Sequence, residues 1–305
     1  MRRLTRLALS ALALGLTGCD GSAPAGGASS VPCLDCGAPE KLLSLPQLEN
    51  SLFTGNGRLF VSGQENLYEV FRDGEGYRAT ALLDGTGCSG LAEDRGHLYA
   101  LCGGSGPTDF SGLYAMPLDD PDASPEPVFE LQDMSLPNGM VVARGALFVT
   151  DGPVASQPKI VRLALDPSDP TAVLGQTTWL DTLPDYPNGL AWDGEALYTT
   201  FYRPGGDGHV SRLGFDADGG FAERSDLAAR GIMDDLIVAE DTLVVTDWQA
   251  SALFQVGLDG VLRQETAANT FAQPSSVVLA GPPLFDTTVL LVTERYTGDG
   301  LWVIR

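Results

Sequence analysis

A short strand pattern recurs six times along this chain and restricts the possible fold more than any other feature of the sequence. Each copy is a leucine followed by aromatic, aliphatic or β-branched residues, as in Leu147-Phe148-Val149. The six marker leucines are Leu59, Leu98, Leu147, Leu197, Leu243 and Leu290, at spacings of 39, 49, 50, 46 and 47 residues. A self-similar period of this length is typical of propellers and solenoids, in which each unit packs against its neighbours.

Each marker strand lies within a unit of four short strands. An apolar run behind a polar or glycine-containing turn precedes it, and two further strands follow it. Six such antiparallel units predict an all-β fold, a six-bladed β-propeller. The last unit lacks its outer strand because the chain stops at Arg305, whereas residues 41–45 are left over at the other end. We therefore expect the N-terminal segment to pair with the last strand and close the ring.

The first residues are typical of a targeting signal. Arg2, Arg3 and Arg6 precede an apolar run over residues 7–16, which is too short for an ordinary membrane span. The run ends in Leu-Thr-Gly-Cys19, which resembles a bacterial lipobox; an ordinary secretory signal with a chance cysteine is the alternative. We predict a lipoprotein signal peptide at residues 1–18, lipidated Cys19 with a flexible tether at 19–40, and the propeller at 41–305.

The charge of the chain restricts its partners. Forty acidic and 18 basic side chains give a net charge of -22, which repels polyphosphates and excludes nucleic acid as a partner. The sequence predicts an exported monomer that a lipid anchor attaches to the bacterial membrane, at its periplasmic or outer surface.

Export permits disulfides, and four cysteines remain when Cys19 is set aside. Cys88 and Cys102 bracket a predicted hairpin and face each other when Ala92 pairs with Leu98, which predicts a cross-strand disulfide. Cys33 and Cys36 form a C-x-x-C pair in the tether. A small structural loop is favoured there over a redox or metal site, because neither a helix start nor a second pair accompanies it.

The repeat brings polar residues into phase at the start of the inner strands. The position nine residues before the marker leucine is occupied by Ser89, Asn138, Asn188 and Asp234. In the last unit the match is Ser275, because an insertion at residues 281–287 lengthens the hairpin. In the first unit the count falls on Asn50, but a turn one residue longer brings Glu49 into phase, and we prefer Glu49.

Such a ring collects two carboxylates and two amide oxygens from separate blades at the axis. Hard oxygen donors of this kind favour Ca²⁺, although another divalent metal remains possible. The predicted metal ligands are Glu49, Asn138, Asn188 and Asp234. The alternative is that the two Pro-Asn-Gly segments and the Asp234 segment are only turns that steer the chain into a strand.

These segments carry a family resemblance over residues 40–305. The chain resembles the gluconolactonase and senescence-marker-protein family, with paraoxonases and strictosidine synthases as more distant relatives. Three features carry the resemblance: strands that begin with Pro-Asn-Gly, strands that end with Leu-Tyr/Phe-Val-Thr-Asp, and the phased Glu, Asn, Asn and Asp residues. The resemblance implies a divalent metal at the axis, held by the same four residues, and hydrolysis of a lactone or ester. The chain departs from the family where it has Asp234-Asp235 in place of Asp-Gly and Glu49-Asn50-Ser51 in place of Glu-Gly-Pro.

The chain has only two histidines, His97 and His209, and we expect both to be exposed rather than catalytic. Without them no Ser-His-Asp or Cys-His arrangement can be assembled. Hydrolysis would then need the metal as Lewis acid and a carboxylate as base, for which Asp234 is the first candidate and Asp235 the second.

The loops between second and third strands share a face with the ring and are expected to contact a substrate. Tyr202, Arg203, Trp248 and Arg295 are the predicted rim residues, and they are accompanied by Asp151, Asp247, Glu294 and Tyr296. The two arginines are conspicuous in so acidic a chain and are suited to a carboxylate product, or else pair with Asp207 or Glu294.

Three functions compete. The first is a divalent-metal-dependent lactonase or esterase that acts on a small molecule at the cell envelope. The second is a non-catalytic propeller that uses the metal only to stabilise a binding module. A quinone-dependent sugar dehydrogenase is weaker, because it would need channel histidines and several arginines around the cofactor.

Overall fold

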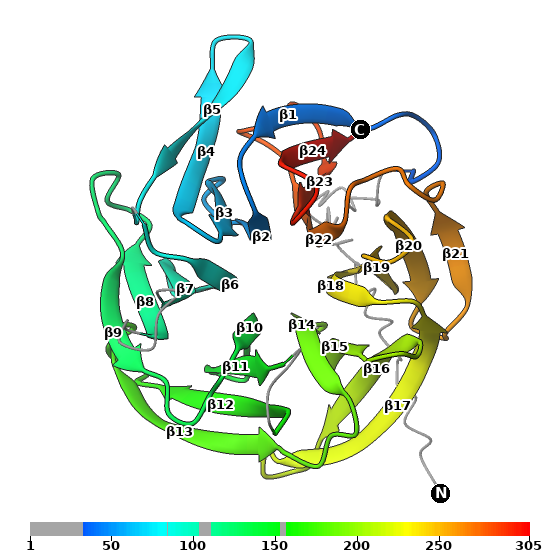
Figure 1. Ribbon diagram of the computed structural model, residues 1–305. Coiled ribbons are helices and arrows are strands. Elements are labelled where there is room, and N and C mark those ends of the chain that lie inside the picture. Colours follow the sequence, from blue (N-terminus) through cyan, green and yellow to red (C-terminus); the bar gives the residue numbers. More distant parts are fainter. Residues whose placement is uncertain (1–32, 84, 104–110, 153–156) are drawn as a thin grey trace, which may run out of the picture.

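The chain forms six antiparallel sheets of four strands each, arranged as blades around a central axis (Figure 1). The computed structural model describes residues 33–83, 85–103, 111–152 and 157–305. In five blades the strands follow chain order from the axis outward, and in the sixth the outer strand is the first strand of the chain. The six-bladed β-propeller predicted from the repeat is therefore confirmed.

The strands are grouped here by their position in the blade. The inner strands are β2 (Leu48–Phe53), β6 (Cys88–Asp94), β10 (Pro137–Ala143), β14 (Tyr186–Trp192), β18 (Met233–Ala239) and β22 (Pro274–Ala280). The second strands are β3 (Leu59–Gly63), β7 (His97–Gly103), β11 (Ala146–Asp151), β15 (Leu197–Tyr202), β19 (Thr242–Asp247) and β23 (Val289–Glu294). The third strands are β4 (Leu67–Asp73), β8 (Ser111–Pro117), β12 (Lys159–Leu165), β16 (Gly208–Phe215), β20 (Ala252–Gly257) and β24 (Gly300–Ile304). The outer strands are β5 (Gly76–Ala81), β9 (Glu126–Glu130), β13 (Val173–Leu180), β17 (Phe221–Arg230), β21 (Leu262–Glu265) and β1 (Glu40–Ser44).

The ring closes through β1, which pairs antiparallel with β24. Ser44 lies opposite Gly300, and the Lys41 ammonium pairs with Asp299 at 2.7 Å while it lies over the Trp302 ring. This confirms the predicted closure by the N-terminal segment. It also places the first and the last strand of the chain in one blade (Figure 1).

The marker leucines of the repeat form the packing between the blades. All six are at most 1% exposed, and each lies in an apolar cluster that joins a blade to its neighbour. In the cluster between the third and fourth blades, Phe148 packs edge-on against Trp179 and Phe215 at centroid distances of 5.2 and 5.6 Å. The leucine recurs because each blade has one face to bury against the next.

The glycines of the two Pro-Asn-Gly segments are required by crowding at the axis. A Cβ on Gly139 would lie 2.2 Å from the carbonyl oxygen of Asn188, and one on Gly189 would lie 2.6 Å from the Asp235 carboxylate. In every inner strand the pairing register also shifts over these positions, as between Pro137 and Met140 in β10. Bulges of this kind redirect side chains, so the same local feature is repeated where the polar ring was predicted.

The predicted disulfide between Cys88 and Cys102 is present, and the two residues lie directly opposite in β6 and β7. The pairing of the hairpin differs by one residue from the prediction, because Ala92 faces Tyr99 rather than Leu98. The register shift after Cys88 restores the alignment of the cysteines.

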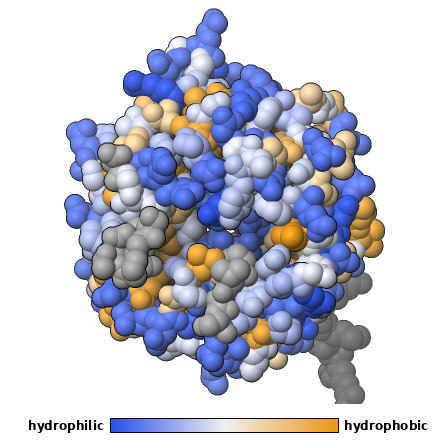
Figure 2. All heavy atoms as spheres, in the orientation of Figure 1, coloured by the Kyte–Doolittle hydropathy of each residue, from blue (hydrophilic) through white to orange (hydrophobic). Residues whose placement is uncertain are grey.

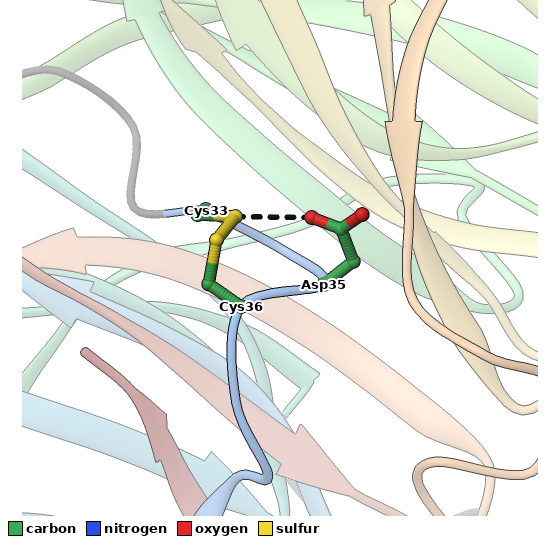
Figure 3. A group of neighbouring side chains, drawn as sticks. All are labelled: Cys33, Asp35 and Cys36. Carbon is green, nitrogen blue, oxygen red and sulfur yellow. Dashed lines mark hydrogen bonds between the residues drawn. A yellow bond between two sulfur atoms is a disulfide. The ribbon is translucent and has the colours of Figure 1, made fainter.

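Cys33 and Cys36 also form a disulfide, and Asp35 lies beside it (Figure 3). The C-x-x-C pair is therefore a structural loop, as predicted, and offers no thiolates to a metal. Leu34 within this loop is 1% exposed among Val244, Leu253 and other residues of the fifth and sixth blades. The end of the predicted tether is thus packed against the propeller.

The signal peptide and Cys19 lie outside the described residues. Within the described part of the chain, no helix is long and apolar enough to cross a membrane.

Candidate metal centre

The four predicted ligands line one pocket of about 200 Å³ at the axis, although they come from four different blades. Glu49, Asn138 and Asn188 are buried, at 4–7% exposed, and Asp234 is half-buried. Tyr202, Ile232, Trp248, Arg295 and Tyr296 complete the lining. The space-filling view shows a hollow at the centre of the ring, with mainly hydrophilic side chains around it (Figure 2).

The structure places Glu49 in this pocket and Asn50 elsewhere. Asn50 lines a separate cavity of about 320 Å³ along the channel, together with Asp235. The register shift between Leu48 and Ser51 in β2 explains why counting nine residues back from the marker leucine reached Asn50.

A belt of hydroxyl side chains on the second strands holds the backbone of the ring, and sequence reasoning missed it. Thr200 Oγ1 accepts a hydrogen bond from Gly189 N at 2.9 Å and donates to the carbonyl of Asp234 in the next blade. Thr150 in the third blade bonds Gly139 N and the Asn188 carbonyl in the same way. The signal was available, because Ser or Thr stands three residues after five of the six marker leucines: Ser62, Thr150, Thr200, Thr246 and Thr293.

Replacing Thr200 with valine is expected to destabilise the protein, because the two side chains have nearly the same shape and only the hydroxyl is lost. The change leaves Gly189 N and the Asp234 carbonyl buried without partners, at about 1–3 kcal/mol each, which lowers the melting temperature by several degrees. Thermal unfolding measures the effect. Thr171→Val is the control, since Thr171 is exposed and bonds only Asp169 in its own turn. Equal melting temperatures for both variants would contradict a supporting role for the belt.

The carboxylate of Asp234 is held by Asn188. The Asn188 Nδ2 donates to Asp234 Oδ1, so its amide oxygen Oδ1 is directed elsewhere and is buried with no hydrogen-bond partner. Burial raises the pKa of Asp234 above its ordinary value, the neighbouring Asp235 adds to the rise, and the bond from Asn188 opposes it. The site therefore disfavours a bare negative charge at Asp234.

Asp235 points away from this pocket. Its carboxylate accepts hydrogen bonds from Ser276 and from backbone N–H groups of Leu236 and Val277, and burial raises its pKa. Because Asp235 lines the other cavity, the structure does not bring the second predicted catalytic residue to the predicted ligands.

Arg295 lies inside the pocket, and its Nη1 contacts the Glu49 carboxylate. Its guanidinium also lies over the Tyr296 ring, 5.0 Å from the centroid. Burial lowers the pKa of Arg295, but an arginine remains protonated in proteins. A cation from the chain itself is therefore already in contact with one of the predicted ligands.

The predicted rim residues separate into two groups. Tyr202, Trp248 and Arg295 line the pocket, as expected of rim residues. Arg203 does not line it and forms a two-pronged ion pair with Asp185 at 2.7 and 2.8 Å, rather than with Asp207 or Glu294.

The strand-end acids of the rim loops do not face the pocket either. Asp151 accepts from Ser135 N and Leu136 N, and Glu294 accepts from Ala272 N, in the segments before β10 and β22. Asp247 accepts from Ala250 N in the turn after β19. These carboxylates hold loops together.

The expectation that both histidines are exposed is wrong for His209. It is 4% exposed, and its ring stacks on Phe201 at a centroid distance of 4.7 Å. The strand β16 begins at Gly208, so His209 lies inside the blade and not on the loop before it. His97, in contrast, is half-buried at the start of β7. Neither histidine lines the pocket.

The melting temperature is expected to fall in acid because of His209. Burial lowers the pKa of His209 below its ordinary value of 6.5. The positive charges of Arg224 and, more weakly, Arg203 lower this pKa further, whereas the negative charges of Asp226 and Asp185 raise it. Below pH 6.5 this histidine binds a proton more readily in the unfolded chain than in the native protein. Protonation therefore favours the unfolded state, and the free energy of unfolding falls as the pH is lowered. His209→Gln should therefore lose less melting temperature between pH 7.5 and 5.5 than the wild type, with His97→Gln as control. Parallel curves for wild type and His209→Gln would contradict this account.

The donor set fits a divalent cation. Two carboxylates and two amides converge on one pocket, and the buried, unpaired Oδ1 of Asn188 is the kind of hard oxygen that Ca²⁺ accepts. A buried polar atom without a partner is costly in a folded protein unless something else satisfies it.

Comparison with known proteins finds solved structures of similar fold. No family model and no curated protein matches the chain. Among solved structures, a gluconolactonase from Xanthomonas campestris is 20% identical with a TM-score of 0.65, covering 90% of this chain and 96% of its own. The calcium-binding protein regucalcin from Agrobacterium tumefaciens is 18% identical with a TM-score of 0.66, covering 90% and 95%. An aldose sugar dehydrogenase with bound PQQ from Streptomyces coelicolor is 16% identical with a TM-score of 0.61, covering 90% and 98%. At these identities the likeness shows the fold alone, that of gluconolactonase- and regucalcin-like six-bladed propellers.

Proposed function

We propose that the pocket binds a divalent cation, Ca²⁺ in the first place, and that the protein hydrolyses a lactone or ester there. The observation that carries the proposal is the convergence of Glu49, Asn138, Asn188 and Asp234 from four blades on one pocket. The resemblance in fold to a gluconolactonase and to a calcium-binding regucalcin supports it. Fold alone does not determine function, since a sugar dehydrogenase shares the architecture.

Each side chain has a defined part in this proposal. Glu49 and Asp234 supply the negative charge that neutralises a divalent ion, and Asn138 and Asn188 supply neutral oxygens. When bound, the cation would polarise the substrate carbonyl and stabilise the charge that develops on its oxygen. Tyr202 and Trp248 form walls against which the rest of the substrate packs.

Asp234 is the side chain best placed to take the proton of the attacking water. It is in the pocket, whereas Asp235 and both histidines are not, and Glu49, the other carboxylate in the pocket, is in contact with Arg295. The base is therefore proposed to be Asp234 alone, which narrows the pair of candidates from the sequence.

Hydrolysis of a panel of lactones and aryl esters, with and without a chelator, tests the function. Turnover that the chelator removes and Ca²⁺ restores is the expected result. If no compound is hydrolysed while Ca²⁺ still raises the melting temperature, the hydrolase proposal fails and the alternative of a metal-stabilised binding module stands. The contact of Arg295 with Glu49 favours a non-catalytic binding module, because the guanidinium already neutralises one of the two carboxylates that a catalytic metal would need.

We also propose that the chain is exported and anchored by lipid on Cys19. The disulfides Cys33–Cys36 and Cys88–Cys102 support an oxidising compartment. The Cys19→Ala variant is expected to move from the membrane fraction to the soluble fraction, since the lipid is the proposed attachment. Cell fractionation of both forms measures this, and an unchanged distribution would contradict the anchor.

A further inference from the structure

Two arginines on the described part of the chain have no anionic partner. The chain has 18 Lys and Arg residues, and all except Arg2, Arg3 and Arg6 are described. Twelve of these 15 form ion pairs with carboxylates. Lys159 bonds a backbone carbonyl instead. The remaining two, Arg144 and Arg162, make no hydrogen bond and no ion pair with the described residues, although the chain carries 40 acidic residues.

Both of these arginines line the same cavity, which is separate from the axial pocket. It has a volume of about 510 Å³ and lies between the third and fourth blades, on the side away from the axis. Arg162 is half-buried in β12, directly between Phe148 of β11 and Thr177 of β13. Arg144 enters from the turn between β10 and β11, and its guanidinium lies over the Phe215 ring at 4.4 Å. The two cations therefore line one hollow, although Arg144 is exposed in a turn and Arg162 is half-buried in a strand.

The rest of the lining offers an aromatic wall, in which the Trp179 and Phe215 rings are tilted by 40° to each other, and hydroxyl groups that have no partner among the described residues. Trp179 forms that wall with Phe215, and its position is fixed because Nε1 donates to Gly219 O at 3.1 Å. The exposed Thr177 and Thr178 make no side-chain hydrogen bond within the described residues. A half-buried guanidinium without an acceptor, an indole wall and unpaired hydroxyls together suit a hydroxylated ring that bears an oxyanion.

We propose that this cavity, called here the inter-blade cavity, binds a small sugar-like molecule that carries a carboxylate or phosphate group. Arg144 and Arg162 hold the oxyanion through charge-assisted hydrogen bonds, Trp179 packs against the ring, and Thr177 and Thr178 bond its hydroxyl groups. The volume is sufficient for a compound of one or two sugar rings.

One acidic residue opposes the binding of an anion and makes the test sharper. Asp218 is exposed on the edge of the same cavity. Its charge is not neutralised by an ion pair within the described residues, so it repels an oxyanion held by the two arginines. Substitutions at Asp218 and at Arg162 must therefore change the affinity in opposite directions.

Glucuronate, glucose 6-phosphate, glucose and inorganic phosphate are the probes, titrated into the purified protein by calorimetry. Binding of either charged sugar, with weaker or no binding of glucose and phosphate, is the expected result, and the carboxylate and phosphate compounds distinguish the two anions. Arg162→Gln and Arg144→Gln should each weaken binding roughly tenfold or more, and Asp218→Asn should strengthen it. Arg212→Gln is the matched control, because this half-buried arginine on the neighbouring β16 is already paired with Glu195 and Glu223.

The four tryptophan indole N–H signals in a ¹⁵N–¹H spectrum identify the site that is occupied. Ligand in the inter-blade cavity should shift the signal of Trp179, whereas ligand in the axial pocket should shift that of Trp248. No saturable binding of either charged sugar, affinity that Arg144→Gln and Arg162→Gln leave unchanged, or a shift of Trp248 alone would overturn the proposal. None of these outcomes depends on whether the axial pocket binds Ca²⁺ or hydrolyses a lactone.

Discussion

Asp234→Asn is expected to abolish Ca²⁺-dependent hydrolysis and most of the stabilisation that Ca²⁺ provides. The substitution keeps the shape of the side chain but removes one of the two negative charges in the pocket and the group proposed to accept the proton. Loss of a general base typically lowers the rate about 10²–10⁴-fold, and a weakened cation adds to the loss. The rise in melting temperature with Ca²⁺ reports cation binding separately, because a ligand that binds only the native state stabilises it.

Asp235→Asn is the matched control for this experiment. It is adjacent in sequence and buried, but its carboxylate lines the other cavity. We expect it to retain both the response to Ca²⁺ and the hydrolysis, although its melting temperature can be lower because bonds to Ser276 are weakened. Retention of the full Ca²⁺ response by Asp234→Asn would place the cation elsewhere. A lost response with undiminished hydrolysis would remove the reaction from this pocket.

Arg295→Met is expected to strengthen Ca²⁺ binding while it destabilises the protein without Ca²⁺. In the wild type the guanidinium contacts Glu49, so a divalent cation must compete with a resident positive charge for the same carboxylate. Two unit charges about 4 Å apart near a protein surface interact by about 4 kcal/mol. We expect removal of this competitor to increase the affinity by about 10–100-fold. Without Ca²⁺ the same change leaves Glu49 buried and unpaired, which is strongly destabilising.

Calorimetric titration with Ca²⁺ and melting curves with and without Ca²⁺ measure the two opposite effects. Arg203→Met serves as the control, since Arg203 is paired with Asp185 outside the pocket. A weaker Ca²⁺ response in Arg295→Met would mean that Arg295 holds Glu49 in place for the cation and does not compete with it. If Ca²⁺ binds Arg295→Met but not the wild type, Arg295 has replaced the metal, and the proposed hydrolase has no cation to use.

The sequence allowed the fold to be predicted almost completely because one position in each unit repeats for a simple physical reason. The marker leucines are buried between blades, and this burial constrains them in the same way six times. The glycines after Asn138 and Asn188 are constrained as strongly, by the backbone of the next inner strand. Features with a repeated cause leave a repeated pattern.

The site was predictable only where the same repetition reached it. Asn138, Asn188 and Asp234 could be aligned by counting, whereas Glu49 required a choice because the bulge in β2 changes the count. The inward position of Arg295 and the burial of His209 have no such signal. Each depends on contacts that exist only in the folded chain, among them those with Glu49 and Phe201 respectively.

The pairing of β1 with β24 has a consequence for when the site comes into existence. Glu49 belongs to the first blade to emerge during synthesis, whereas Asp234 and Arg295 belong to the last two. The carboxylates can approach one another only after the final blade has accepted the N-terminal strand, whose partner residues run to Val303. A nascent chain, or one from which a protease has removed β24, would thus keep the first five blades complete but would lack the closed metal centre, so that cation affinity would report whether the ring is intact.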